Sequence, residues 1–200
     1  PTAVRGLILA NTRAGADTPE GRANRRNMLA LVDREGPQGV AQEMMPKLLG
    51  KTSRDVNPSL EPTVRRLIKQ QSPVAIRGAI LRMMHRPDSM PLLASVAVPT
   101  LVIVGDQDPS TPPDHARFIA AQVGGARLVE LERARHLLNV EHPDRVTGED
   151  LFDHLAHPQL GPELQTLGQR DHRDPGAKER LDRIVTAIAR NMGSYGSDCG

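Results

Sequence analysis

Two groups of polar residues in the second half of the chain follow short apolar runs. Asp106 and Asp108 come directly after the run at residues 96–105, and His136 follows the run at residues 127–131 after a short loop. If both runs are parallel strands, their carboxyl ends meet at the sheet edge where α/β proteins place active sites. A carboxylate bonded to one imidazole nitrogen leaves the other nitrogen free as a general base. The spacing therefore predicts a catalytic pair of Asp108 and His136.

Each half of this pair also has a structural interpretation. Asp side chains readily bond their own backbone, so Asp106 and Asp108 alone would indicate only a turn. A single loop histidine such as His136 is most often structural or solvated. The prediction depends on the two features following successive strands.

The elements that must position the pair alternate as in a parallel α/β sheet. Apolar runs predict three strands, at residues 4–10, 96–105 and 127–131. Between the first two strands the pattern is helical throughout. Thr18 caps a helix that has Pro19 at its first position and ends at Gly36. Further helices are expected at residues 39–49, 62–71, 73–85, 113–122 (capped by Thr111), 143–156 and 176–192.

This alternation predicts an α/β fold that is incomplete, with three parallel strands, a helical cap and a helical tail. The four expected segments are residues 1–16 (first strand and exit loop), 17–95 (cap), 96–157 (carboxy-terminal part of the core) and 158–200 (tail of unknown role). The strand from Gly6 to Ala10 needs a neighbour on both edges to satisfy its backbone. No sequence is left over to supply the second neighbour.

Composition excludes several classes of protein. The chain has 200 residues, of which 38% are hydrophobic and 25% charged, and no window approaches the ~20 apolar residues that span a bilayer. Aromatic residues make up 2% of the chain and none precedes Phe118, which argues against nucleic-acid binding. A single cysteine, Cys199, fits a reducing compartment, so a cytoplasmic location is expected. Because the first residue is Pro1 rather than Met, we expect a piece of a longer product.

Charge is unevenly distributed along the chain. Residues 17–95 carry thirteen Lys and Arg against eight Asp and Glu, whereas residues 96–157 carry five against ten. The basic segment is either a set of solvated helix faces or a positive lid over an anionic small molecule.

The remaining histidines suggest a metal site only weakly. His154 and His157 lie three residues apart, with Asp150, Asp153 and His172 nearby. None of these spacings is diagnostic, and a solvated helix face explains them better, so no metal is expected.

Several motifs together resemble the α/β-hydrolase superfamily over roughly residues 1–156. The strand and acid motif is VPTLVIVGDQD at residues 98–108, followed by TPP at 111–113 and HLLNVEHP at 136–143. LILANTRAGADTPEGR at residues 7–22 and RPDS at 86–89 resemble the 3-oxoadipate enol-lactonase-like branch. The resemblance implies a Ser–His–Asp triad that needs no cofactor, with Asp108 as the orienting acid and His136 as the base.

The chain departs from the family pattern in two places. The family's nucleophile lies in a Gly-x-Ser-x-Gly elbow between a strand and a helix, and that elbow would precede Pro1. Met192-Gly193-Ser194-Tyr195-Gly196 is a partial match, but an expected helix precedes it, which disfavours a circular permutation. The family usually has Gly before the histidine, where this chain has Arg135. We expect this bulky cation to crowd the imidazole or to oppose its protonation.

The leading hypothesis is the carboxy-terminal portion of a serine hydrolase of esters or lactones, with little activity by itself. Its substrate would be anionic, and five cap arginines are candidates to meet substrate carboxylates: Arg22, Arg25, Arg26, Arg82 and Arg86. An alternative is a non-catalytic subunit that pairs the open strand from Gly6 to Ala10 with a nucleophile-bearing chain. A third hypothesis keeps the hydrolase but replaces the lactone by a simple ester.

Overall fold

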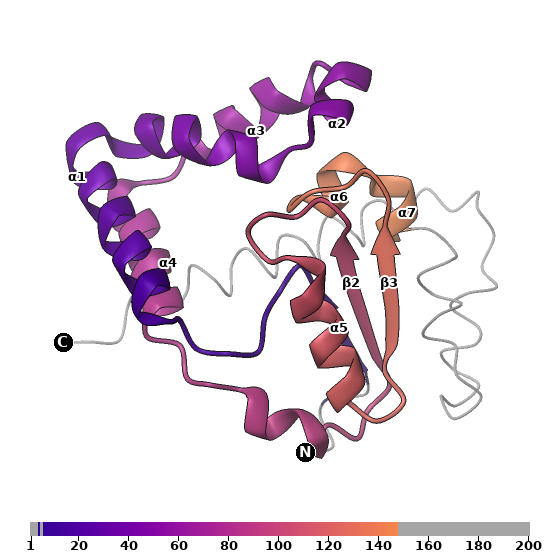
Figure 1. The fold of residues 1–200 in the computed structure, drawn as a ribbon. Coiled ribbons are helices and arrows are strands. Elements are labelled where there is room, and N and C mark those ends of the chain that lie inside the picture. The colour runs from indigo at the N-terminus through magenta and orange to yellow at the C-terminus, as the bar shows by residue number, and fades with distance from the viewer. Residues whose placement is uncertain (1–3, 5, 148–200) are drawn as a thin grey trace.

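The computed structural model, drawn in Figure 1, describes residue 4 and residues 6–147. It is built on a three-stranded parallel sheet. The strands are β1 (Leu7–Ala10), β2 (Thr100–Gly105) and β3 (Arg127–Leu131), and they lie in the order β1-β2-β3. Leu7 pairs with Thr100, and Leu101 pairs with Arg127. Because the strands are parallel, all three carboxyl ends meet at one edge of the sheet.

Strand β2 is the centre of the core, since all six of its residues are buried. Val102 and Val104 pack with Ala116 and Ile119 of helix α5 (Pro113–Gln122), which lies across the sheet in Figure 1. Leu101 and Ile103 point to the opposite face and pack with residues that include Leu131 and Leu138. A β-branched run buried on both faces is typical of an interior parallel strand, and the strand predicted in this region is present.

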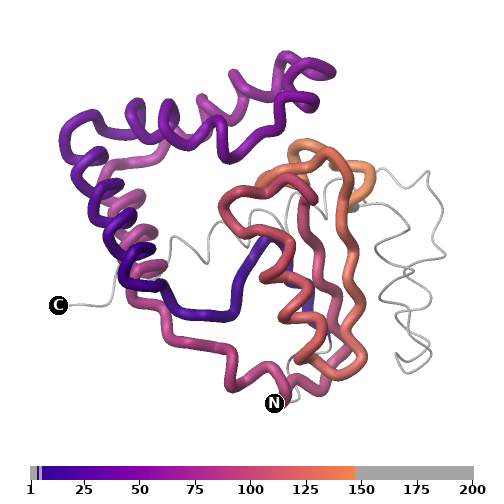
Figure 2. The backbone as a smooth tube through the Cα atoms, in the orientation of Figure 1, coloured from indigo at the N-terminus to yellow at the C-terminus, as the bar shows by residue number. Residues whose placement is uncertain are grey.

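The helical segment between β1 and β2 forms its own apolar clusters. Its helices are α1 (Pro19–Leu48), α2 (Lys51–Val56), α3 (Leu60–Lys69) and α4 (Pro73–Met84), followed by the 3₁₀ helix η1 (Met90–Ser95). Figure 2 follows the chain out of β1, along these helices and back to the sheet. One cluster joins α1 to α4 through Val32, Val40 and Ile80. A second joins the end of α1 to α3 through Met45, Leu49 and Val64.

The start of α1 confirms one prediction and its interior refines another. The Thr18 side chain caps the helix by accepting a hydrogen bond from the Gly21 N–H at 3.0 Å, and Pro19 is the first helical residue. Gly36, expected to end this helix, breaks it with a φ of 61°. The helical path resumes at once, so the structure has a kinked element that ends at Leu48.

Other boundaries differ from the predicted ones. Strand β2 starts at Thr100 rather than at residue 96, since η1 ends at Ser95 and residues 96–99 connect it to the strand without strand pairing. Helices α2, η1 and α6 (Leu138–Glu141) were not predicted, since each spans at most six residues and shows no clear periodicity. Helix α7 (Pro143–Thr147) is the first part of the helix expected at 143–156. The rest of that helix and the expected tail at 158–200 lie outside the described residues.

Strand β1 has an exposed side. Among the described residues it pairs only with β2, and Ile8 remains 46% exposed in the middle of the strand. Val4, which precedes the strand, is 51% exposed. The second neighbour that the sequence analysis requires is thus not found in the part of the chain that the structure describes.

None of the helices in residues 6–147 has the length and apolar character needed to cross a bilayer.

Candidate active site

The structure brings Asp108 and His136 together at the carboxyl edge of the sheet. Asp108 Oδ2 lies 2.8 Å from His136 Nδ1. The Asp108 side chain is fully buried, whereas the His136 side chain is 27% exposed. Within the described residues, His136 Nε2 makes no hydrogen bond. The two residues have the relative positions that an orienting acid and a general base require.

The Asp108 carboxylate is held in its ionised form. The backbone N–H of Ser110 donates to Oδ1 at 2.8 Å, and the Thr111 hydroxyl donates to Oδ2 at 2.6 Å. Burial acts to raise the pKa of Asp108, but hydrogen bonds from His136 and Thr111 outweigh it, and the pKa is lowered. Because an ionised carboxylate only accepts, His136 Nδ1 must be the donor, which leaves Nε2 as the free basic nitrogen of the neutral ring.

This arrangement corrects the prediction for Thr111, which is not the cap of helix α5. Pro112 occupies the cap position of that helix and provides no side-chain hydrogen bond. The Thr111 side chain turns back to Asp108 instead, so its role belongs to the site.

Asp106 has a different role from Asp108. It is exposed, and its Oδ1 accepts the Ala134 N–H at 3.3 Å. Asp106 therefore has the structural role considered in the sequence analysis: it shapes the turn after β2 and contacts the loop that carries His136.

Asn11 positions the His136 loop from the end of β1. Its side-chain amide donates to the carbonyls of Arg135 and His136 at 3.0 and 2.7 Å, while its Oδ1 accepts the Gly105 N–H at 3.1 Å. Its φ of 43° is in the left-handed region, which Asn tolerates better than most residues. A Cβ on Gly105 would collide with the carbonyls of Ala134 and Arg135, so glycine permits this close approach. Sequence reasoning assigned Asn11 only to a polar loop.

Arg135 does not pair with the imidazole. Its guanidinium donates to the Pro46 carbonyl near the end of α1. Its backbone N–H donates to Glu141 Oε1 at 2.8 Å. The side chain expected to crowd His136 is thus directed to the helical segment.

One of the five candidate arginines, Arg25, pairs with a buried carboxylate together with Arg13, and a second candidate, Arg86, lies close enough to repel these two guanidinium groups. Asp17, whose side chain is fully buried, forms ion pairs with Arg13 and Arg25, the latter at 3.1 Å. Arg86 donates to the Gly15 carbonyl at 2.8 Å. Burial lowers the pKa of all three arginines, and repulsion between guanidinium groups lowers those of Arg13 and Arg86 further. We call this group (Asp17, Arg13, Arg25 and Arg86) the Asp17 junction.

The other three candidates are not members of the Asp17 junction. Arg22, Arg26 and Arg82 are exposed. Among the described residues, none of the five arginines forms a hydrogen bond or ion pair with Asp108 or His136. Of the other residues singled out, His154, His157, His172, Asp150, Asp153, Ser194 and Cys199 lie outside the described residues.

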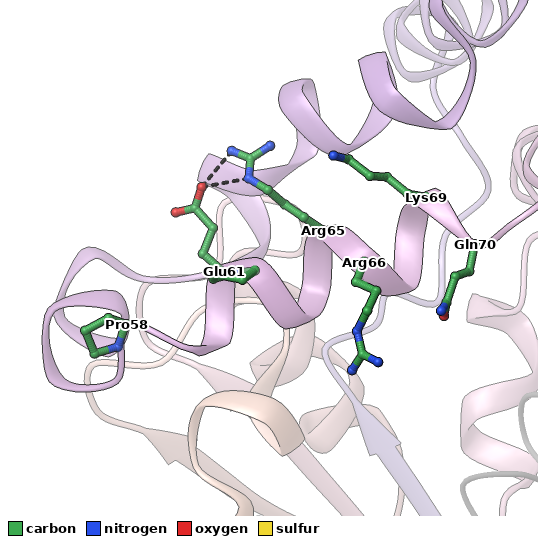
Figure 3. Close-up of a pocket in the computed structure, with 7 residues that line it drawn as sticks. Pro58, Glu61, Arg65, Arg66, Lys69 and Gln70 are labelled. Carbon is green, nitrogen blue, oxygen red and sulfur yellow. Dashed lines mark hydrogen bonds and ion pairs between the residues drawn. The ribbon is translucent and has the colours of Figure 1, made fainter.

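A groove of about 680 Å³ lies along α3, away from these residues. Figure 3 shows its lining, in which Arg65 forms a hydrogen-bonded ion pair with Glu61. Arg66, Lys69 and Gln70 line it as well, but neither Asp108 nor His136 does. The groove is therefore separate from the candidate active site.

Several known proteins are similar to this chain. Residues 2–149 match the profile described as the alpha/beta hydrolase family. Rhodomycin D methylesterase DauP of Streptomyces sp. is 38% identical over 78 residues, which are 39% of this chain and 22% of that protein. A pimeloyl-[acyl-carrier protein] methyl ester esterase of Neisseria meningitidis is 25% identical over 131 residues, covering 56% of this chain and 50% of that protein.

Two solved structures extend the comparison to the fold. A thermophilic esterase from Thermogutta terrifontis, solved with malate bound, superposes with a TM-score of 0.67 at 38% identity. The match covers 71% of this chain and 52% of that one. The enol-lactonase from Burkholderia xenovorans LB400 superposes with a TM-score of 0.68 at 25% identity, covering 77% and 57%. The chain thus spans about half the length of these two solved structures and of the pimeloyl esterase.

Proposed function

The chain belongs to the alpha/beta hydrolase family, and we propose that it carries the acid and base of a Ser–His–Asp ester or lactone hydrolase. In this proposal Asp108 is the orienting acid and His136 the base, and the nucleophilic serine lies outside these 200 residues. The observation that carries it is the 2.8 Å contact between Asp108 Oδ2 and His136 Nδ1, which leaves Nε2 available. The esterases among its relatives and structural neighbours support the class of reaction.

The proposed chemistry assigns two proton transfers to His136 in each half-reaction, one to Nε2 and one from it. Nε2 takes the proton of the serine hydroxyl while the serine oxygen bonds to the substrate carbonyl carbon. It then gives that proton to the departing alcohol oxygen as the ester bond breaks. Water repeats the sequence on the acyl-enzyme and releases the acid. Buried, ionised Asp108 stabilises the imidazolium formed each time.

Two observations support placing the serine elsewhere. No serine in the 200 residues lies in a Gly-x-Ser-x-Gly sequence. Strand β1 pairs on one edge only among the described residues and leaves Ile8 46% exposed. We propose that a strand and elbow bearing the serine add to this edge, next to the His136 loop that Asn11 fixes.

The exposed edge of β1 also favours the alternative of a separate subunit. In that case the nucleophile-bearing strand belongs to another chain, and this chain supplies Asp108 and His136 on association. The two versions differ in whether one reading frame encodes both parts.

The proposed substrate is a small ester or lactone that carries a negative charge. The Asp17 junction has three guanidinium groups and one carboxylate, so positive charge is in excess there. Arg25 and Arg86 are the two candidate arginines that belong to this positively charged junction. The malate-bound esterase supports an anionic ligand, and the enol-lactonase supports a lactone as one possible electrophile.

The test uses the protein encoded by the whole reading frame in which these residues occur, and in parallel the 200-residue chain. Each is assayed with methyl and aryl esters, neutral and carboxylated, and with an enol-lactone, and each is labelled with a fluorophosphonate probe. We expect hydrolysis and labelling of the whole product at a serine outside this chain. Labelling of the isolated 200 residues, or a whole product without hydrolase activity, would contradict the proposal.

A further inference from the structure

Glu141 connects the His136 loop to the helical segment through one carboxylate. Its Oε2 accepts the Gly50 N–H at 2.9 Å and the Ser53 hydroxyl at 2.6 Å. Its Oε1 accepts the Arg135 N–H at 2.8 Å. Gly50 precedes α2 and Ser53 lies within it, whereas Arg135 is the residue before His136. We call these four residues (Glu141, Gly50, Ser53 and Arg135) the Glu141 junction.

The contacts around this junction hold the loop on both sides of His136. The Leu137 N–H donates to the Leu48 carbonyl at 3.2 Å, and the Arg135 guanidinium donates to the Pro46 carbonyl. Leu137 also packs against the apolar cluster at the end of α1. The residues before and after His136 are therefore both bonded to the end of α1, and Glu141 links the first of them to the start of α2.

The packing leaves little room for the Glu141 carboxylate to move. A Cβ on Gly50 would lie only 3.1 Å from Glu141 Oε2. The Gly50 N–H and the Ser53 hydroxyl meet the same oxygen, and Ser53 is buried. A displacement of α2 therefore moves Glu141, and Glu141 moves the Arg135 peptide that precedes the histidine.

We propose that Glu141 is a positioning residue that makes the placement of His136 depend on the placement of α2. The carboxylate touches neither Asp108 nor the imidazole and acts through the Arg135 backbone. Through it, a shift of the helical segment on substrate binding changes the distance from His136 to Asp108. This inference rests on the proposed function of His136 as the base, but its first measurement does not require activity.

The first measurement is the NMR signal of the proton on His136 Nδ1, which is held in the hydrogen bond to Asp108. It is recorded for the 200-residue chain and for three variants. Glu141→Gln replaces one acceptor oxygen with an amide that faces donors, and Ser53→Ala removes one donor on the α2 side. Glu43→Gln is the matched control, since Glu43 forms an exposed ion pair with Lys47 on α1.

We expect the His136 signal to weaken or shift in Glu141→Gln and, to a lesser degree, in Ser53→Ala, but not in Glu43→Gln. Ser53→Ala is the decisive variant, because Ser53 belongs to α2 and its side chain is linked to the His136 loop, within the described residues, by its hydrogen bond to Glu141. If Glu141→Gln fails to fold by circular dichroism, Ser53→Ala alone decides. An unchanged His136 signal in Ser53→Ala would overturn the inference.

The second measurement is kinetic and uses the protein encoded by the whole reading frame. Glu141→Gln should lower kcat by about 10- to 100-fold with KM nearly unchanged, because a small misplacement of a catalytic group reduces rate more than binding. Ser53→Ala should lower kcat by about fivefold, as for the loss of one hydrogen bond. A rise in KM at constant kcat would contradict a positioning role. If His136→Ala retains full activity, the proposed function is wrong. The NMR measurement then still tests whether Glu141 couples the placement of His136 to that of α2.

Discussion

The helical segment is joined to the sheet at two junctions, and each centres on one carboxylate. At the Asp17 junction the partners are guanidinium groups, and the Asp17 side chain is fully buried. At the Glu141 junction the partners are two backbone N–H groups and one hydroxyl. The Asp17 junction joins the exit of β1 to the start of α1, near the segment after α4. The Glu141 junction joins the start of α2 to the loop that carries His136.

The difference shows that the loss of stability on removing a carboxylate depends on which partner groups remain unpaired. Without Asp17, positive charges remain close together and partly buried, which is unfavourable wherever they turn. Without Glu141, only neutral donors remain, and water or a small shift of the loop can satisfy them. We therefore expect the Asp17 junction to dominate stability and the Glu141 junction to dominate the placement of His136.

The largest effect on stability is expected from Asp17→Asn. The amide cannot compensate Arg13 and Arg25, so the free energy of unfolding should fall by about 3 kcal/mol, the lower end for breaking a buried ion pair. Glu141→Gln should lower it by about 1 kcal/mol. Urea unfolding of the 200-residue chain measures both. If the free energy of unfolding falls equally in both variants, or more in Glu141→Gln, the claim that the Asp17 junction dominates stability is wrong.

Arg86→Gln tests whether the excess charge at the Asp17 junction serves an anionic substrate. We expect KM for a carboxylated ester to rise about tenfold, or about 1.4 kcal/mol, with KM for the matching neutral ester unchanged. The difference should shrink as salt is added. Arg77→Gln serves as the control. It removes an exposed ion pair between Arg77 of α4 and Asp33 of α1, neither of which belongs to the Asp17 junction. Equal KM changes for both esters would assign Arg86 a purely structural role.

Asp108 is buried like Asp17, and its contribution to stability can be tested through pH. Its folded pKa lies below its ordinary value of 3.8, so its ionised form stabilises the fold above that value. This stabilisation is lost as the pH falls through the folded pKa. Wild type should therefore unfold at a higher temperature than Asp108→Asn near pH 7, and the gap should narrow only below about pH 4. A gap that is independent of pH from 7 to 2 would show that the charge of Asp108 contributes nothing to stability.

Ser53→Ala should have the smallest effect on stability. It removes one hydroxyl donor from Glu141 while Gly50 and Arg135 still donate, so the free energy of unfolding should fall by about 1 kcal/mol or less. Differential scanning calorimetry against Glu43→Gln measures the change. A loss as large as that of Asp17→Asn would mean that the Glu141 junction also controls the stability of the fold.

The contact between Asp108 and His136 could be predicted from the sequence because its determinants are local. Asp108 and His136 each follow a strand within a few residues, and parallel strands end at one edge whatever the rest of the chain does. The strand runs and the Thr18 cap were recognisable for the same reason. These elements can be predicted without knowing which distant residues they contact.

The supports of the pair could not be predicted, because they depend on contacts between distant segments. Asn11 reaches carbonyls more than 120 residues away, and Glu141 meets Gly50 and Ser53 from about 90 residues away. Nothing in the local sequence distinguishes Arg25 and Arg86 from the three exposed arginines. They differ because the start of α1 and the segment after α4 lie close together in the fold.

The most direct test of the proposed function is the rate of ester hydrolysis by the protein encoded by the whole reading frame, with His136→Ala compared with His115→Ala. His115 is an exposed histidine on α5 and serves as the matched control. We expect kcat to fall by about 10⁴-fold or more in His136→Ala, as for removal of the base from a serine triad, and to stay unchanged in His115→Ala. A His136→Ala variant that retains the rate of the wild type would contradict the assignment of His136 as the base.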